Sequence, residues 1–200
     1  MLWDYGGVLT ESPFNNFSKY EKELKIPLGS IANINKENSY KNSWAQLEKN
    51  LISINDFLEL FKNECDKKGL YKICPRKVLD CLKLEPNYEM LNILKKVASI
   101  FDCACLTNNI QDYKNNNVEF ARIRHYFKFI FESSKLGLRK PEEEIYKMVL
   151  KKLKVEANEI LFIDDIGMNL KVAKELGIQT YKFLDTESTV NFLKKSLNFK

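Results

Sequence analysis

Asp4, Lys140 and the pair formed by Asp164 and Asp165 are the residues whose types and spacing could do chemistry. Asp4 follows a short apolar segment at the beginning of the sequence and precedes a glycine-rich turn. Asp164 and Asp165 follow a second apolar run. Lys140 lies between them, after another apolar stretch. A carboxylate at a strand end can act as a nucleophile, and a second carboxylate can hold a divalent cation beside it. A lysine can balance the charge of a phosphorylated substrate, so the combination predicts a metal-assisted phosphoryl-transfer site.

The elements that must position these residues alternate along the C-terminal half. Helices are expected over 87–97, 142–153, 169–176 and 188–197, and strands over 102–106, 129–131, 160–163 and 178–183. Pro141 suits the first turn of a helix, and Gly177 suits a helix end. Alternating strands and helices predict an α/β fold with a mainly parallel sheet and helices on both faces. Ligands bind beyond the carboxyl ends of such strands, where Asp4, Thr107 and Asp164 are expected.

Residues 14–84 follow a different pattern, which predicts helices and no strand of comparable quality. We expect a helical insertion between the first and second strands, lying above the site as a cap. The predicted division is therefore a core of residues 1–13 and 85–200 and a cap of residues 14–84. Only three residues precede Asp4, so the first strand is either short or truncated in this sequence.

Spacing within the expected cap locates its helices. Trp44, Leu47 and Leu51 recur at helical intervals, and Trp44 is expected in the core of the cap. Ser53 and Asp56 resemble a capping box at the start of a further helix, which Gly69 is expected to end.

The composition limits the classes of partner. The chain has 200 residues, 44% of them hydrophobic, which is enough to bury a full core. Its net charge of +5 comes mostly from lysines scattered among glutamates, and no basic run is interleaved with aromatic residues, so nucleic acid is not an expected partner. No apolar stretch has membrane-spanning length and no leader opens the chain, so no membrane partner is expected either.

The five cysteines form no C-x-x-C pair, and the single histidine, His125, leaves little material for a zinc site. We interpret the cysteines as reduced thiols in a cytoplasmic protein. His125 is expected to be structural or exposed.

Each motif, taken singly, has an ordinary structural explanation. An aspartate before two glycines is a common turn residue, and a lone lysine is usually solvated. Thr107, Asp164 and Asp165 could each cap a helix. If all of these explanations were correct, four unrelated structural residues would have to fall at strand ends by chance. We therefore favour a functional site.

Four segments resemble, in their order, the four motifs of the haloacid dehalogenase (HAD) superfamily. They are Asp4-x-Gly-Gly-Val-Leu-Thr, Leu106-Thr107-Asn108, Gly137-Leu-Arg-Lys140-Pro-Glu and Asp164-Asp165-Ile-Gly-Met-Asn169. The chain is similar in particular to the branch that contains the N-terminal phosphatase domain of soluble epoxide hydrolases and small bacterial sugar-phosphate phosphatases. The resemblance implies a HAD-like Rossmannoid three-layer sandwich with a small helical cap after the first strand. It also implies Mg²⁺-dependent hydrolysis of a small organic phosphate monoester, with a sugar phosphate as one candidate.

The resemblance implies a role for each metal-site residue. Asp4 would attack phosphorus and form an aspartyl phosphate. Mg²⁺ would be held by Asp4, the backbone carbonyl of Gly6, water and the pair Asp164 and Asp165. The branch favours Asp165 as the direct ligand, with Asp164 engaging bound water. Asn169 would support the metal-binding loop without binding the metal itself.

The phosphate-binding residues follow from the same resemblance. The Thr107 hydroxyl and the Asn108 backbone N–H would hold phosphate oxygens, and Lys140 would neutralise charge on the nucleophile and the phosphoryl group. Weaker candidates for contact with the rest of the substrate lie after the first motif: Glu11, Asn15 and Asn16.

Gly6 departs from the family pattern. Phosphatases of this superfamily usually carry a second aspartate there, which protonates the leaving group and then activates water. Loss of such a group costs roughly 10²–10⁴-fold for a poor leaving group. Related small phosphatases also have glycine at this position, so activity is still expected. Gly6 predicts either a substitute group or substrates whose leaving oxygen needs little protonation, such as anomeric sugar phosphates or acyl phosphates.

Two other functions fit parts of the pattern. In metal-independent dehalogenation Asp4 would attack carbon, and Gly6 would suit that chemistry, but the pair of Asp164 and Asp165 would be unexplained. A degenerate binding protein that keeps the fold would also accommodate Gly6, whereas the intact Asp4 and Lys140 argue against it. We expect a small phosphorylated metabolite as partner and a monomer or homodimer as the assembly.

Overall fold

Strands and helices alternate through the C-terminal half of the chain, as its sequence predicts. The computed structural model describes residues 1–111 and 118–197. The strands are β1 (Leu2–Trp3), β2 (Ala104–Thr107), β3 (Phe129–Glu132), β4 (Leu161–Asp164) and β5 (Gln179–Lys182). The helices are α1 (Pro13–Leu24), α2 (Ser30–Lys36), α3 (Ser43–Glu48), α4 (Ile54–Lys67), α5 (Pro75–Asp80), α6 (Tyr88–Ala98), α7 (Val118–Ile123), α8 (Ser133–Leu136), α9 (Glu143–Leu153), α10 (Gly167–Glu175) and α11 (Thr186–Leu197), with 3₁₀ turns η1 (Arg124–Tyr126) and η2 (Ala157–Glu159). Within these residues, no helix joins enough length to enough apolar character to cross a lipid bilayer.

Every pair of neighbouring strands in the described sheet is parallel, in the order β3-β2-β1-β4-β5. The predicted α/β fold with a mainly parallel sheet is confirmed. The strand order changes direction between β1 and β4, which lie side by side. Trp3 pairs with Ile163, so the residues that follow them, Asp4 and Asp164, leave the sheet next to each other. Open α/β sheets bind ligands at such a switch point, beyond the carboxyl ends of the strands.

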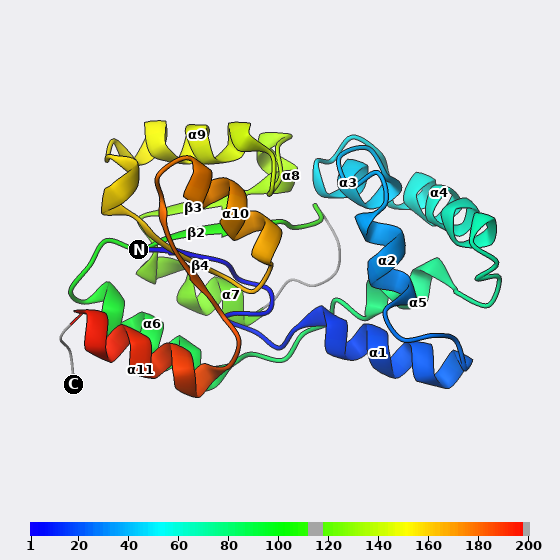
Figure 1. Ribbon diagram of the computed structural model, residues 1–200, viewed down its shortest axis with the longest axis horizontal. Coiled ribbons are helices and arrows are strands. Elements are labelled where there is room, and N and C mark those ends of the chain that lie inside the picture. The colour runs from blue at the N-terminus through cyan, green and yellow to red at the C-terminus, as the bar shows by residue number, and fades with distance from the viewer. Residues whose placement is uncertain (112–117, 198–200) are drawn as a thin grey trace.

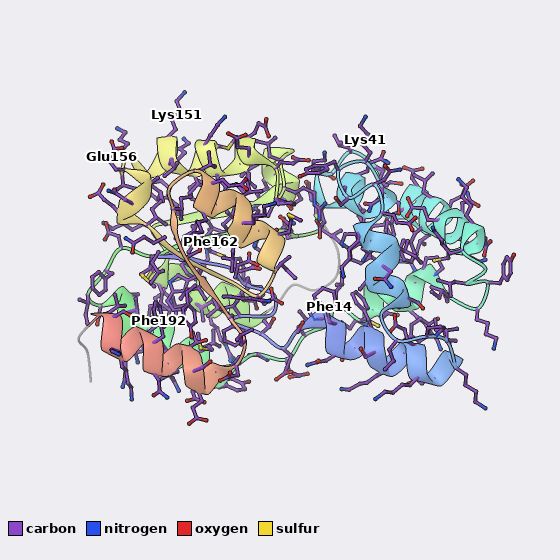
Figure 2. All side chains as sticks on the ribbon, in the orientation of Figure 1. Phe14, Lys41, Lys151, Glu156, Phe162 and Phe192 are labelled. Atoms are coloured by element: carbon purple, nitrogen blue, oxygen red, sulfur yellow. The ribbon has the colours of Figure 1, made fainter. Side chains whose placement is uncertain are left out.

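Helices cover both faces of the sheet and make it the middle of three layers (Figure 1). Strand side chains alternate between the two faces because the backbone is pleated. The face that includes Leu2 and Phe162 packs against α9 and α10. The face that includes Trp3 and Ile163 packs against α6 and α11. Figure 2 shows Phe162 in the middle layer and Phe192 on α11 in an outer layer.

Helices α1 to α5 lie beside the sheet and share a separate hydrophobic cluster (Figure 1). We call them the helical unit, residues 13–80. The ring of Trp44 lies 6.3 Å from that of Phe17, 5.3 Å from that of Phe57 and 6.0 Å from that of Phe61, measured between centroids. Trp44 is buried in this cluster, as predicted. The helical unit thus has an apolar core distinct from the two cores that flank the sheet.

Several local predictions are confirmed. Ser53 and Asp56 form the expected capping box at the start of α4. Gly69, with φ of 73°, follows the end of α4, and Gly177, with φ of 88°, follows the end of α10. These positive φ angles are conformations that glycine adopts without steric cost.

Two local predictions are wrong. Leu51 is 64% exposed and lies beyond α3, because Asn50 adopts a left-handed conformation with φ of 58° that ends the helical spacing. Pro141 does not lie in the first turn of α9. Glu142 is extended and is the N-cap of α9, and its amide donates to the carbonyl of Arg139 (2.8 Å). Pro141 therefore belongs to a turn that precedes the helix.

Candidate active site

Asp4 lies where the central strand β1 ends. Its amide donates to the carbonyl of Ile163 (2.9 Å), which fixes its backbone to β4. Its side chain is buried, and Oδ1 accepts a hydrogen bond from the amide of Tyr5 (2.7 Å). Burial raises the pKa of Asp4 well above its ordinary value, Lys140 opposes that rise, and neighbouring carboxylates add to it. An ionised Asp4 therefore depends on positive charge close by.

Lys140 supplies that charge from the turn before α9. Its side chain is 1% exposed, and Nζ lies 2.8 Å from Asp4 Oδ1 and 2.7 Å from Asp164 Oδ2. Asn108 fixes its main chain, because the Lys140 amide donates to Oδ1 (2.9 Å) and Nδ2 donates to the Lys140 carbonyl (3.0 Å). Burial alone lowers the pKa of Lys140, but Asp164 and Asp4 outweigh that effect and raise it above its ordinary value. Lys140 is therefore charged at neutral pH.

Asp164 and Asp165 follow one another after β4 but have different surroundings. Asp164 is fully buried. Its oxygens accept hydrogen bonds from Nδ2 of Asn169 (3.1 and 3.0 Å), from the amide of Ile166 (2.7 Å) and from Lys140. Asp165 is partly exposed. Because protein donors already engage both oxygens of Asp164, Asp165 has more capacity for an added ligand.

The carboxylates of Asp4, Asp164 and Asp165 form a group that suits a divalent cation. One oxygen from each lies within 4.8 Å of the others. Burial, followed by the charge of Asp164, raises the pKa of Asp165 to about 6, while Lys140 opposes this rise. When ionised, the three carboxylates and the buried Lys140 leave two negative charges in the cluster. A divalent cation would balance them, and oxygen donors are those that Mg²⁺ prefers.

Gly6 and Gly7 form the turn beside the cluster, and only Gly7 is sterically constrained. Gly7 has φ of 81°, and a Cβ there would lie 2.3 Å from Asp165 Oδ2. Its amide donates to Oγ1 of Thr10 (3.3 Å), which closes the turn. A Cβ on Gly6 would meet no described atom within 4 Å. The chain therefore approaches Asp165 closely at Gly7 and leaves space at Gly6.

The loop after β2 completes this edge of the sheet. Thr107 is the last residue of β2 and is buried. Asn108 follows it and binds the main chain of Lys140, a contact that its expected role as a backbone donor does not include. The amide of Asn109 donates to Ser133 Oγ (2.9 Å), which fastens the loop to α8. The residues of all four motifs thus lie at the carboxyl edge of the sheet.

Glu11 lies in the linker that leads from the sheet to the helical unit, and Asn15 and Asn16 lie in the first turn of α1. The Glu11 amide donates to the carbonyl of Glu85 (2.8 Å), and Asn15 Nδ2 donates to Glu11 Oε2 (3.3 Å). Asn16 Nδ2 donates to the carbonyl of Cys81 (3.0 Å). The three residues line a surface cavity of about 530 Å³. Their side-chain and main-chain bonds tie α1 to the returning linker.

Tyr146 and Arg139 are functional candidates to which the motifs assign no role, although Arg139 lies within the third motif. Helical spacing places Tyr146 on an apolar face, yet its hydroxyl donates to the carbonyl of Asn169 (2.9 Å) and supports the loop after β4. Arg139 donates from Nε to Glu48 Oε2 of the helical unit (2.6 Å). Its position beside Lys140 is the sequence signal that could have identified it.

Several known proteins that are similar to this chain are named as hydrolases or phosphatases. A family profile described as haloacid dehalogenase-like hydrolase matches residues 26–183. The chain is 29% identical over 211 residues to bifunctional epoxide hydrolase 2 from Sus scrofa, covering 97% of this chain but only 38% of that protein's length. It is 27% identical to the sesquiterpene phosphatase astK from Aspergillus oryzae, covering 94% of this chain and 91% of that protein. A solved HAD family enzyme from Bacteroides thetaiotaomicron, in complex with magnesium and inorganic phosphate, matches with a TM-score of 0.56 and 28% identity over 90% of this chain and 91% of that one.

Proposed function

This chain belongs to the family of haloacid dehalogenase-like hydrolases, and from that membership we propose that it is a Mg²⁺-dependent phosphatase. Its substrate is a small organic phosphate monoester, with a sugar phosphate as one candidate, and the reaction passes through an aspartyl phosphate on Asp4. A relative named as a phosphatase and a similar enzyme that holds magnesium and inorganic phosphate support this proposal. A cytoplasmic setting, in which the cysteine thiols stay reduced, is part of the same proposal.

One observation carries the proposal: buried Lys140 bridges Asp4 and Asp164, with Nζ 2.8 Å and 2.7 Å from their oxygens, beside the exposed edge of Asp165. Such an arrangement holds a carboxylate ionised in a site from which water is largely excluded. It also presents positive charge where a phosphoryl group would approach. Nucleophile activation and phosphate attraction then come from the same lysine.

Asp4 acts as the nucleophile. One of its oxygens attacks phosphorus, the bond from phosphorus to the leaving oxygen breaks, and that oxygen departs with the electron pair. Water then attacks the phosphorus of the aspartyl phosphate and releases inorganic phosphate and Asp4. Lys140 neutralises charge on the attacking carboxylate and on the phosphoryl oxygens, while the Thr107 hydroxyl and the Asn108 amide donate to those oxygens.

Asp4, Asp165 and the carbonyl of Gly6 would hold a Mg²⁺ ion, which would supply further neutralisation of the phosphoryl charge. Asp164 acts indirectly, because its oxygens are engaged by protein donors. Asn169 fixes the orientation of Asp164 through two hydrogen bonds.

Residues 14–84 act as the cap of this site and select the organic part of the substrate. The core, residues 1–13 and 85–200, performs the phosphoryl transfer. Gly6 offers no side chain that could protonate a leaving group, which favours substrates with a stable leaving oxygen, such as acyl or anomeric sugar phosphates.

Dehalogenation remains the second candidate because Gly6 favours a reaction that needs no acid at this position. Its mechanism has no use for a divalent cation, and the grouping of three carboxylates within 4.8 Å weighs against it. Chloride release from a haloacid without Mg²⁺ would reverse this ranking.

A phosphate-release screen tests the proposal. Sugar, acyl, nucleotide and lipid phosphates are each incubated with the protein, with Mg²⁺ and with a chelator. We expect release from at least one class, dependent on Mg²⁺. Asp4→Asn should reduce that release by at least about 10⁴-fold because the nucleophile is lost.

Asp102→Asn is the matched control, since Asp102 is an exposed carboxylate paired with Lys128 outside the cluster (2.5 Å). It should keep full activity. Undiminished activity in Asp4→Asn would reject the nucleophile, and undiminished activity with the chelator would reject the role of the metal. Mg²⁺ binding without turnover of any substrate class would favour a degenerate binding protein.

A further inference from the structure

Four charged residues join the helical unit to the core beside the proposed site. Arg139 Nε lies 2.6 Å from Glu48 Oε2, and Lys49 Nζ lies 2.7 Å from Glu142 Oε1. The two pairs are connected, because the Arg139 amide donates to Glu142 Oε2 (3.2 Å). We call these four residues the ionic bridge. Glu48 and Lys49 belong to the end of α3, whereas Arg139 and Glu142 belong to the turn before α9.

The ionic bridge is shielded from solvent, unlike an ordinary surface ion pair. Its side chains are only 12–15% exposed, whereas the i,i+4 pair of Glu143 and Lys147 on α9 is 50% and 60% exposed. Exposed pairs contribute little to stability because water and salt screen them. A shielded network that is also hydrogen-bonded leaves an uncompensated charge when one member is removed.

Arg139 makes two different contacts with the helical unit. In addition to Glu48, it binds the carbonyl of Ser39 through Nη1 (2.6 Å). The planar guanidinium serves both acceptors at once, which a lysine ammonium on a flexible stem does poorly. Glu48 is fixed in turn, because Trp44 Nε1 donates to its Oε1 (2.9 Å) and Ser133 Oγ donates to its carbonyl (2.8 Å). The bridge therefore joins the aromatic cluster of the helical unit to the turn that carries Lys140.

A further attachment of the helical unit is the pair of linkers at the other end. The Glu11 amide donates to Glu85 (2.8 Å), and the Asn87 amide donates to the carbonyl of Leu9 (3.0 Å). Figure 1 shows α3 next to α8 at one side, and the start of α1 with its linker at the other. The linkers are a main-chain attachment. The ionic bridge is the charged side-chain attachment opposite to them, beside the hydrogen bonds from Ser133 Oγ to the Glu48 carbonyl (2.8 Å) and from Asn50 Nδ2 to Gln111 Oε1 (2.9 Å).

The segment that Arg139 fastens lies close to the loops of the proposed site. Ser39 and Tyr40 belong to the connection between α2 and α3, and Lys49 Nζ binds the carbonyl of Tyr40 (3.4 Å). Arg139, which binds the carbonyl of Ser39 in this connection, directly precedes Lys140 in the chain. The bridge thus holds the α2–α3 connection beside the turn that carries Lys140.

We propose that Arg139 is a positioning residue: through Glu48 and Ser39 it holds the helical unit against the core, and this closure orders the surface that binds the organic part of the substrate. The inference rests on the proposed phosphatase activity and names the device that sets its selectivity. Substrates large enough to contact the helical unit depend on the bridge. Acetyl phosphate, whose organic part is too small to need that surface, does not.

Kinetics provide the first test. Glu48→Gln keeps the shape of the side chain and its bond to Trp44 but removes the charge, and it touches neither Asp4 nor Lys140. Arg139→Gln removes the other partner. Each should raise KM for the best large substrate about tenfold, because only a fraction of molecules is closed, with kcat nearly unchanged. Acetyl phosphate turnover should change less than about threefold. The double variant should be no worse than Arg139→Gln alone, since that variant already breaks the contact with Glu48 as well as the one with Ser39.

Lys147→Gln is the matched control, because it breaks the exposed pair on α9 and should leave both substrates unaffected. The KM of Arg139→Lys for the large substrate should lie between those of wild type and Arg139→Gln, because lysine keeps the charge but lacks the planar guanidinium that serves two acceptors. Equal loss on acetyl phosphate and the large substrate would mean that the variants damage the site itself. Additive losses in the double variant would mean that Arg139 and Glu48 act separately. Either result overturns the proposal.

A distance measurement tests closure without any reaction, so it separates a failure of this inference from a failure of the phosphatase proposal. Spin labels are placed at Lys41→Cys and Lys151→Cys, whose side chains point into solvent from the helical unit and α9 (Figure 2). The exposed Cys74 is first replaced by serine.

The wild-type bridge should give one narrow distance distribution, and Glu48→Gln should broaden it and shift it to longer distances. Lys147→Gln should leave it unchanged. An unchanged distribution in both Glu48→Gln and Arg139→Gln would show that the bridge does not hold the helical unit, even if the enzyme releases phosphate as proposed. If Glu48→Gln broadens the distribution but the wild type releases no phosphate, the role of the bridge in holding the helical unit is supported and the phosphatase activity is rejected.

Discussion

The carboxylate cluster at the sheet edge and the aromatic cluster of the helical unit are both buried, yet they are held together by different interactions. In the first, Lys140 lies within 3 Å of two carboxylates, and hydrogen bonds fix Asp164 from several directions. In the second, Trp44 packs on Phe17, Phe57 and Phe61 through ring contacts of 5.3–6.3 Å. The stability of a buried charged cluster depends on the geometry and presence of every partner, whereas the free energy gained by apolar packing is roughly proportional to the apolar area that is buried.

The difference has a functional consequence. Removing the positive charge of Lys140 from the cluster leaves its carboxylates buried without compensation, so both stability and chemistry should suffer. Removing an aromatic ring from the helical unit leaves a cavity, which costs stability but does not reach the reacting groups. The core is thus expected to fix the chemistry, and the helical unit is expected to accept variation in substrate selection.

Lys140→Met is the largest test of this contrast. It should abolish phosphate release and lower the free energy of unfolding by about 3–5 kcal/mol at pH 7, because buried Asp4 and Asp164 lose their counterion. The loss should be smaller at pH 5, where Asp4, whose pKa is already raised by burial, can take up a proton. Urea unfolding at both pH values, without Mg²⁺, measures the effect. Lys147→Met, in an exposed pair, should change little, and equal effects of the two variants would contradict the contrast.

Phe61→Ala probes the aromatic cluster. Phe61 is fully buried in α4, and truncation should lower the free energy of unfolding by about 3–5 kcal/mol through the cavity that it leaves. Acetyl phosphate turnover per folded molecule should stay within about twofold of wild type. Its neighbour Leu60, 38% exposed on the same helix, provides the control, and Leu60→Ala should cost far less. A loss of turnover in folded Phe61→Ala would show that the two regions are coupled beyond the ionic bridge.

Asp165→Asn tests how much the burial of ionised Asp165 destabilises the folded protein in the absence of metal. Burial raises the pKa of Asp165 to about 6 from an unfolded value of 3.8, so the folded state binds more protons between these values. Stability of the metal-free wild type should therefore fall as pH rises from about 4 to about 6 and stay low above that. By linkage, Asp165 accounts for about 3 kcal/mol of this fall.

Asp165→Asn should remove that part of the fall, making the metal-free protein more stable than wild type at pH 7 but not at pH 4. Mg²⁺ favours ionised carboxylates, so it should raise the melting temperature of wild type at pH 7 and that of the variant much less. If the stability of wild type and variant depended on pH in the same way, Asp165 would not be the carboxylate whose pKa burial raises.

The sequence predicts the core well because the signals there are local. Alternating apolar runs and helical spacing locate β2 to β5, and parallel strands bring Asp4, Thr107 and Asp164 to one edge whatever the details of packing. The family that the four-motif resemblance implies is confirmed by the matching profile, which spans residues 26–183.

The features that the sequence does not predict depend on contacts between distant segments or on backbone geometry. Arg139 and Glu48 are 91 positions apart, and neither has a neighbouring residue that marks it as half of an ion pair. Asn108 binds the main chain of Lys140, a contact that no residue pattern encodes. Leu51 fits helical spacing, but the left-handed Asn50 ends the helix first. Each of these needs the tertiary structure.

Gly6→Asp gives the smallest expected effect and the sharpest test of how the two regions divide the work. A Cβ at Gly6 meets no described atom within 4 Å, whereas one at Gly7 would lie 2.3 Å from Asp165 Oδ2. Position 6 can therefore accept a side chain. A carboxyl group there could protonate a leaving oxygen, so hydrolysis of an alkyl phosphate should rise by about tenfold or more, toward the lower end of acid–base effects.

Acetyl phosphate, whose leaving group needs little protonation, should gain nothing from Gly6→Asp, and that difference separates an acid from a general change in the site. Gly6→Ala adds the Cβ without the carboxyl group and should match wild type on both substrates. Gly7→Ala should lose most activity, because its Cβ displaces Asp165 and its φ of 81° strains any residue but glycine. If Gly6→Asp accelerates neither substrate while Gly6→Ala is tolerated, the leaving group receives its proton from elsewhere, and the helical unit becomes the place to search for the donor.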